Sequence, residues 1–216
     1  RLLHITASPR GPDSFSRALA GEALEALGQV RSRCRVETLD LQERELPSLD
    51  RAFIDAKARW MAEEAMTDRE ASAWRPVESL IRDLTAADGY LLSLPMWGLG
   101  LPYPLKHYLD AVIQPGLTFR LDPAGEHQGL LANRPAGLIL ARGDRYGPGS
   151  GREDLDFQRP HIEALLRFMG VGPIQTLVME PTEGEPAEVA EAYRRARTEA
   201  RELGRDLGKE GREPGR

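Results

Sequence analysis

Five short apolar or alternating runs recur along the chain, and a turn and then residues with helical spacing separate each run from the next. The runs are residues 2–6, 35–41, 88–94, 136–141 and 175–179. The third and fourth are apolar almost throughout, which is typical of strands buried on both faces of a parallel sheet. The alternation predicts an α/β fold with a five-stranded parallel sheet of order 2-1-3-4-5 and helices on both faces.

Helical spacing is found at residues 16–27, 51–66 and 155–169, and from Pro186 onward. Two further helices are expected to begin near Pro76 and Pro104, because proline suits the first helical turn. The segment 51–66 is longer than a minimal crossover requires. We interpret it as a solvated helix over the sheet, with a rim or subunit contact as the alternative. One domain over residues 1–207 is expected, with a disordered tail at residues 208–216.

Composition and charge argue against several classes of protein. The 216 residues carry a formal net charge of -5, which provides no broad basic surface for nucleic acid. No apolar run approaches the roughly 20 residues of a membrane span, and the N-terminus resembles a strand rather than a signal peptide. We therefore expect a soluble cytoplasmic protein with no membrane partner. Cys34 is the single cysteine, which excludes an internal disulfide and a cysteine-clustered metal site, and no metal is predicted.

The loop after the first strand carries three serines just ahead of a helix. Ser8, Ser14 and Ser16 could offer hydroxyls to a phosphate at the positive end of the helix dipole, together with free backbone N–H groups. The alternative is that Ser14 or Ser16 serves only as the helix N-cap. Neither a Walker P-loop nor the G-x-G-x-x-G dinucleotide motif is present.

Two glycine-containing loops follow the third and fourth strands, at residues 95–100 and 142–151. In the first, Met96 and Trp97 offer flat, polarizable surface, although this loop taken alone fits an ordinary turn equally well. Parallel strands bring the carboxyl ends of the first, third and fourth strands to one crevice, where ligands bind. Together the three loops favour a planar ring that carries one phosphate over a triphosphate, since no lysine cradle is found.

Several motifs support a resemblance to a known family. They are Ser8 with Ser14-Phe15-Ser16, Leu46-Pro47-x-Leu49-Asp50, Pro95-Met96-Trp97 with Leu105-Lys106-x-Tyr108-x-Asp110, Pro115-Gly116-Leu117-Thr118-Phe119-Arg120, Gly129-Leu130-Leu131 and Arg142-Gly143. On these motifs the chain resembles the FMN-dependent NADH azoreductases, which are also quinone reductases with a flavodoxin-like fold. The resemblance covers residues 1 to about 179 and is most specific between Pro95 and Arg120.

The resemblance implies that FMN is the cofactor and that a homodimer partner completes the site. The serines would hold the flavin phosphate, residues 96–99 would lie along the isoalloxazine ring, and residues 141–144 would close its pyrimidine side. Trp97 and Phe119 would frame the substrate. The cofactor-binding residues that it implies are Ser8, Ser14, Phe15, Ser16, Pro95, Met96, Trp97, Gly98, Leu99, Ala141, Arg142, Gly143 and Asp144.

The implied activity is two-electron ping-pong transfer from NADH or NADPH to quinones and azo compounds. The flavin would carry the chemistry, so no catalytic side chain is named. The chain departs from the family pattern at Gly98, where asparagine is common, and at Asp144, where glycine is frequent. We expect these changes to affect substrate range and flavin potential. The alternatives are a flavodoxin-like one-electron carrier, which the mixed charges do not favour, and a non-catalytic flavodoxin-fold binding protein.

Overall fold

The structure, a computed structural model, describes residues 1–210 of the chain, and its strands form one large sheet and one small one. The five-stranded sheet has the order β2-β1-β3-β6-β7, with all neighbouring strands parallel. Strands β4 and β5 form a separate antiparallel pair. The strands are β1 (Leu2–Thr6), β2 (Val36–Asp40), β3 (Gly89–Pro95), β4 (Phe119–Leu121), β5 (His127–Gly129), β6 (Ala136–Ala141) and β7 (Ile174–Met179).

The predicted class of fold is confirmed, but the strand order differs in chain numbering from the predicted 2-1-3-4-5. The difference arises because β4 and β5, which were not predicted as sheet strands, lie between β3 and β6 along the chain. Their residues are exposed or half-buried, so they carry little of the apolar signal that marks the sheet strands.

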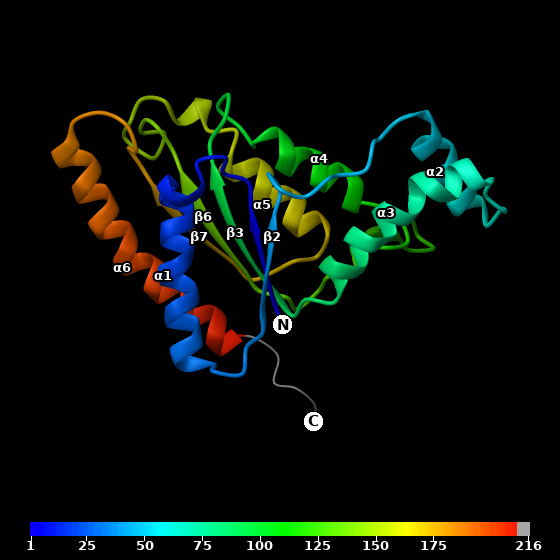
Figure 1. Cartoon of the computed structure of the whole chain (residues 1–216), viewed down its shortest axis with the longest axis horizontal. Helices are drawn as coiled ribbons and strands as arrows, with labels where there is room; N and C mark the ends of the chain where they lie inside the picture. Colours follow the sequence, from blue (N-terminus) through cyan, green and yellow to red (C-terminus); the bar gives the residue numbers. More distant parts are fainter. Residues whose placement is uncertain (211–216) are drawn as a thin grey trace.

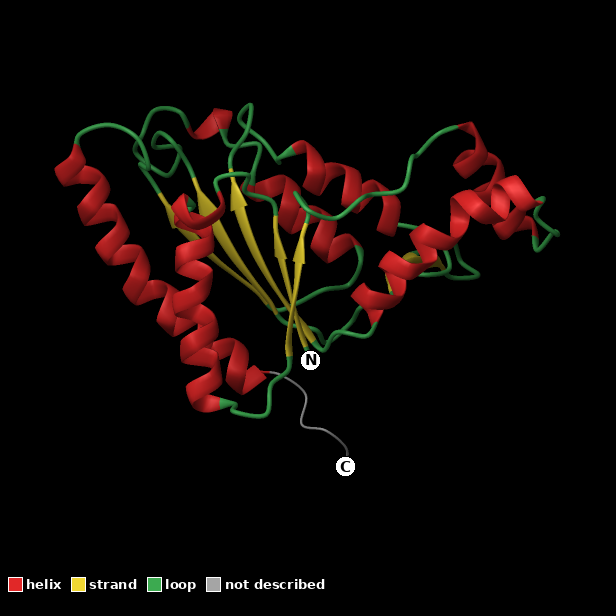
Figure 2. Cartoon of the chain, in the orientation of Figure 1, coloured by secondary structure: helices red, strands yellow, loops and turns green. Residues whose placement is uncertain are grey.

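Within residues 1–210 the structure has six α-helices and two short 3-10 helices (Figure 2). They are η1 (Gly11–Asp13), α1 (Phe15–Val30), α2 (Arg51–Ala62), α3 (Asp68–Thr85), α4 (Tyr103–Val112), η2 (Glu153–Leu155), α5 (Arg159–Phe168) and α6 (Pro186–Glu210). Because α6 continues to Glu210, the first residues of the predicted tail are helical, and residues 211–216 lie outside the described part of the chain.

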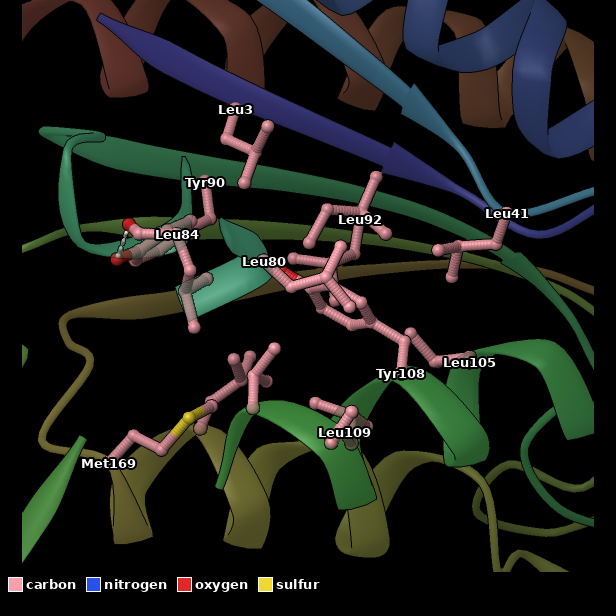
Figure 3. Packing of buried hydrophobic residues seen from close by; sticks show 14 of the residues in the cluster. Leu3, Leu41, Leu80, Leu84, Tyr90, Leu92, Leu105, Tyr108, Leu109 and Met169 are labelled. Atoms are coloured by element: carbon pink, nitrogen blue, oxygen red, sulfur yellow. Dashed lines mark hydrogen bonds between the residues drawn. The ribbon is translucent and has the colours of Figure 1, made fainter. Parts of the chain in front are cut away.

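Helices α1 and α6 lie side by side on one face of the sheet, and α3, α4 and α5 cover the other (Figure 1). The approach of α6 to α1 depends on Gly204, where an added Cβ would overlap the carbonyl of Ala23. On the opposite face, leucines from the strands interdigitate with those of α3 and α4, and Tyr90 donates a hydrogen bond to the Leu84 carbonyl (Figure 3).

Helix α3 begins at Asp68 rather than at Pro76, so the predicted start was wrong. Thr67 and Glu70 form a capping box, in which each side chain accepts a hydrogen bond from the other residue's backbone N–H. This cap fixes the start two turns earlier and leaves Pro76 inside the helix. Helix α2 packs on α3 through stacking of Phe53 on Trp74 and projects beyond the sheet (Figure 1).

No helix within residues 1–210 is both long enough and apolar enough to cross a membrane.

Candidate functional site

A cavity of about 150 Å³ opens where β1, β3, β6 and β7 end. These carboxyl ends are the edge at which parallel doubly wound sheets bind ligands. The cavity is lined by Ser8, Arg10, Ser14, Phe15, Ser16, Pro95, Met96, Trp97, Ala141, Gly143, Thr182 and Glu183. Nine of these residues were predicted from the sequence, so residues from three distant loops meet in one place.

The serine loop forms the polar part of the cavity. Ser14 is the N-cap of α1, and its hydroxyl accepts a hydrogen bond from the Arg17 N–H at 3.4 Å. The Ser14 and Ser16 hydroxyls lie 3.1 Å apart, and these two residues and Ser8 are all buried. The N-cap reading of Ser14 is therefore confirmed, and the same residue faces the cavity. Since the first N–H groups of a helix lack intrahelical partners, hydroxyl and N–H donors meet here in an arrangement that suits an anion.

The loop after β3 is a tight turn closed by two hydrogen bonds. The Trp97 N–H donates to the Gly100 carbonyl at 3.1 Å, and the Gly100 N–H donates to the Trp97 carbonyl at 2.9 Å. Between them Gly98 and Leu99 have positive φ values of 52° and 66°. The turn presents Met96 and Trp97 to the cavity, whereas Gly98 and Leu99 are not among its lining residues.

The end of β6 contributes Ala141 to the cavity and the loop after it contributes Gly143, whereas Arg142 and Asp144 are not among the lining residues. The guanidinium of Arg142 is turned into the protein and is 1% exposed. It donates to Asp156 at 2.8 Å and to Glu180 at 3.3 Å. Asp144 is exposed and forms an ion pair with Arg152. Arg142 thus stabilises the cavity wall through buried ion pairs, and the Asp144 charge is paired with Arg152.

Phe119 also lies away from the cavity lining. Its ring is 4.7 Å from that of Phe168 on α5 and 5.6 Å from that of His127 across the β4–β5 pair. These contacts attach the small sheet to α5. The predicted role of Phe119 in framing a substrate remains a prediction that this arrangement does not support.

Three lining residues were not predicted: Arg10, Thr182 and Glu183. Thr182 and Glu183 follow β7, whose carboxyl end reaches the same edge as the other strands. Applying the sheet-edge argument to the fifth strand as well would have found them. Arg10 stands within the predicted serine loop, and its charge gave a direct signal for anion binding.

A buried histidine, His4, lies on β1, the strand that leads into the serine loop. A ring nitrogen of His4, Nε2, is 2.9 Å from the Ser93 hydroxyl, and Nδ1 is 3.5 Å from that of Thr38. Burial, with a smaller contribution from the nearby charge of Arg17, lowers the pKa of His4 to about 4. The imidazole is therefore neutral near pH 7.

The fold and the cavity define a doubly wound α/β protein with a ligand crevice at the switch between β1 and β3. The sequence profile of the family described as having a flavodoxin-like fold matches residues 1–203, and the chain belongs to this family.

Among individual proteins, the chain is 37% identical to the FMN-dependent NADH:quinone oxidoreductase of Desulfotalea psychrophila, over 96% of this chain and 97% of the relative. It is 38% identical to FMN-dependent NADH:quinone oxidoreductase 3 of Pseudomonas fluorescens, over 92% and 93%. A solved azoreductase from Bacillus anthracis shares the fold with a TM-score of 0.86 at 24% identity, over 95% of this chain and 98% of that one. An FMN-dependent NADH-azoreductase from the same species, in complex with FMN, has a TM-score of 0.82 at 23% identity, over 94% and 98%.

Proposed function

We propose that the chain is an FMN-dependent oxidoreductase that uses NADH to reduce quinones, with azo compounds as further acceptors. The observation that carries the proposal is the meeting of buried serine hydroxyls, a helix N-terminus and the Met96–Trp97 surface in one cavity. The relationship to FMN-dependent NADH:quinone oxidoreductases over nearly the whole chain supports the same function.

The lining residues fit a flavin mononucleotide at both of its ends. Ser8, Ser14 and Ser16 supply hydroxyl donors beside the start of α1, which matches the needs of a phosphate group. Met96 and Trp97 supply apolar, polarizable surface for a flat ring. We assign the phosphate to the serines and the ring to the Met96–Trp97 turn, with the Ala141–Gly143 backbone at the ring edge.

When bound, FMN accepts a hydride from NADH and delivers two electrons to the acceptor. The protein's own contribution is orientation. The hydrogen-bonded turn at residues 97–100 holds the Trp97 backbone in place, and the half-buried Met96 keeps water from one side of the ring site. Arg10 and Glu183 are the only ionisable residues that line the cavity, and both are exposed to water. We therefore assign proton delivery to solvent.

Reconstitution with FMN tests the binding half of this proposal. Purified protein is mixed with FMN, freed of unbound ligand by gel filtration, and examined by absorbance. Retention of about one flavin per chain is expected. A colourless protein after the same treatment would contradict the proposal, and riboflavin added in place of FMN separates phosphate recognition from ring stacking.

We propose further that the protein is a cytoplasmic homodimer. Support comes from α2, which exposes Ile54 in its first turn and Trp60 and Met61 in its last. Trp60 and Met61 border a groove of about 600 Å³ that also contacts Pro115. Apolar side chains gathered on one surface are typical of a subunit contact. Light scattering of the protein with and without Met61→Lys tests this: a dimer that the substitution weakens is expected, and a monomeric wild-type protein would contradict it.

A further inference from the structure

An arginine and a glutamate face each other across the mouth of the cavity. Nη2 of Arg10, in the loop after β1, lies 3.7 Å from Oε1 of Glu183, in the loop after β7. Strands β3 and β6 separate β1 from β7 in the sheet. The ion pair therefore spans the width of the crevice, and both of its members line the cavity.

The glutamate is fixed to the cavity wall by its backbone. The Glu183 N–H donates to the Gly143 carbonyl at 3.1 Å, and the Thr182 N–H donates to the Arg142 carbonyl at 2.8 Å. The carboxylate lies over Gly143, since a Cβ added there would be 3.3 Å from Oε2 of Glu183. The carboxylate thus lies beside the loop that follows β6, while most of the side chain stays in contact with solvent.

The two charges act on an anionic ligand in opposite directions. Arg10 attracts a phosphate at the serines, whereas Glu183 repels it and also competes for Arg10. Their side chains are 60% and 70% exposed, and ion pairs this exposed contribute little to stability. Arg10 can therefore exchange its carboxylate partner for a phosphate at small cost.

We propose that Arg10 and Glu183 together set how strongly the site prefers a phosphorylated flavin over the same flavin without phosphate. Arg10 binds the phosphate monoester after leaving Glu183, and Glu183 reduces the affinity for that ligand. The inference rests on the proposed function, since it takes the ligand to be a flavin, and it adds the two side chains that determine ligand charge selectivity.

Titration of FMN and riboflavin, followed by flavin fluorescence at low ionic strength, tests the inference. Removing one charge near a phosphate dianion is expected to change affinity by about five- to tenfold. Glu183→Gln should tighten FMN binding by that factor, and Arg10→Gln should weaken it. Riboflavin affinity should stay within about twofold of the wild type in both variants, and 0.5 M salt should shrink the FMN effects.

Glu185→Gln is the matched control. It removes the same charge from a residue that is two positions from Glu183 and does not line the cavity. Its FMN affinity should match that of the wild type. The inference is overturned if Glu183→Gln leaves FMN affinity unchanged or lowers it, or if FMN and riboflavin shift equally, which would place Glu183 at the ring. Failure of both flavins to bind the wild-type protein would overturn the proposed function as well.

Discussion

The guanidinium of Arg142 donates to the carboxylate of Asp156 at 2.8 Å in a site where Arg142 is 1% exposed. The same guanidinium donates to Glu180, which also accepts the N–H groups of Tyr146 and Gly147. One buried cation thus ties together the end of β6, the end of β7 and the approach to α5. This network holds the wall of the cavity that Ala141 and Gly143 line.

Replacing Arg142 by methionine should destabilise the protein by about 3–5 kcal/mol, because it leaves two carboxylates facing a site without their cation. Urea unfolding measures the difference. The matched control is Arg145→Met, whose partner Glu188 is 4.0 Å away at the exposed surface and whose loss should cost less than about 1 kcal/mol. Equal effects of the two substitutions would show that the Arg142 network contributes no more than a surface pair.

The free energy of unfolding should fall as the pH is lowered through the range in which His4 is protonated in the unfolded chain but neutral in the folded protein. The folded-state pKa of about 4 lies below the ordinary histidine pKa of 6.5, so the unfolded chain binds the proton first as the pH falls. The stabilisation is complete above pH 6.5 and is lost progressively toward pH 4, by an amount on the order of 3 kcal/mol.

Unfolding of the wild type and of His4→Gln at a series of pH values checks this expectation. The variant should lose the part of the pH dependence that lies between pH 6.5 and 4. His161→Gln, on the exposed surface of α5, is the control and should keep it. Parallel curves for wild type and His4→Gln would refute the role assigned to His4.

Gly98 should tolerate asparagine but not valine. Its φ of 52° is unfavourable for most residues with a Cβ, although a Cβ there would meet no other atom within 4 Å. Asparagine adopts this conformation readily, whereas a β-branched residue does so at a cost of about 1–3 kcal/mol. Thermal unfolding of Gly98→Asn and Gly98→Val measures this difference in stability, and FMN titration shows whether it reaches the binding site. Equal stability of the two variants would mean that backbone strain does not select the residue at position 98.

Loss of the Ser16 hydroxyl should weaken FMN much more than riboflavin. A hydrogen bond to a charged group contributes about 1.5–3 kcal/mol, so Ser16→Ala should raise the FMN Kd by roughly 10- to 150-fold. Ser72→Ala, on the exposed surface of α3, should bind both flavins as the wild type does. An equal loss of affinity for FMN and riboflavin would place the phosphate away from the serines.

Most of the sheet could be predicted from the sequence because its strands are buried. The runs at 2–6 and 136–141 coincide with β1 and β6, since strands covered on both faces leave a continuous apolar signal. The start of α3 could not be placed from Pro76 alone. A capping box at Thr67 and Glu70 outweighs the preference of proline for a first turn.

The cavity was only partly predictable, and the residues that differ show why. Ser8, Met96 and Gly143 line the cavity because each follows the carboxyl end of a sheet strand, and that position alone brings them to the same edge of the sheet. Arg142 stands at such an end too, but Asp156 and Glu180, distant in sequence, draw its side chain inward. Pairings of this kind depend on tertiary contacts that local patterns do not contain.

Anaerobic titration of the FMN-loaded protein with NADH, followed by addition of a quinone, tests the central claim most directly. The absorbance band of oxidised flavin should bleach with about one equivalent of NADH and return in full when one equivalent of quinone is added. A flavin band that NADH leaves unchanged, or a bleached band that quinone does not restore, would contradict the claim that this chain reduces quinones at the expense of NADH.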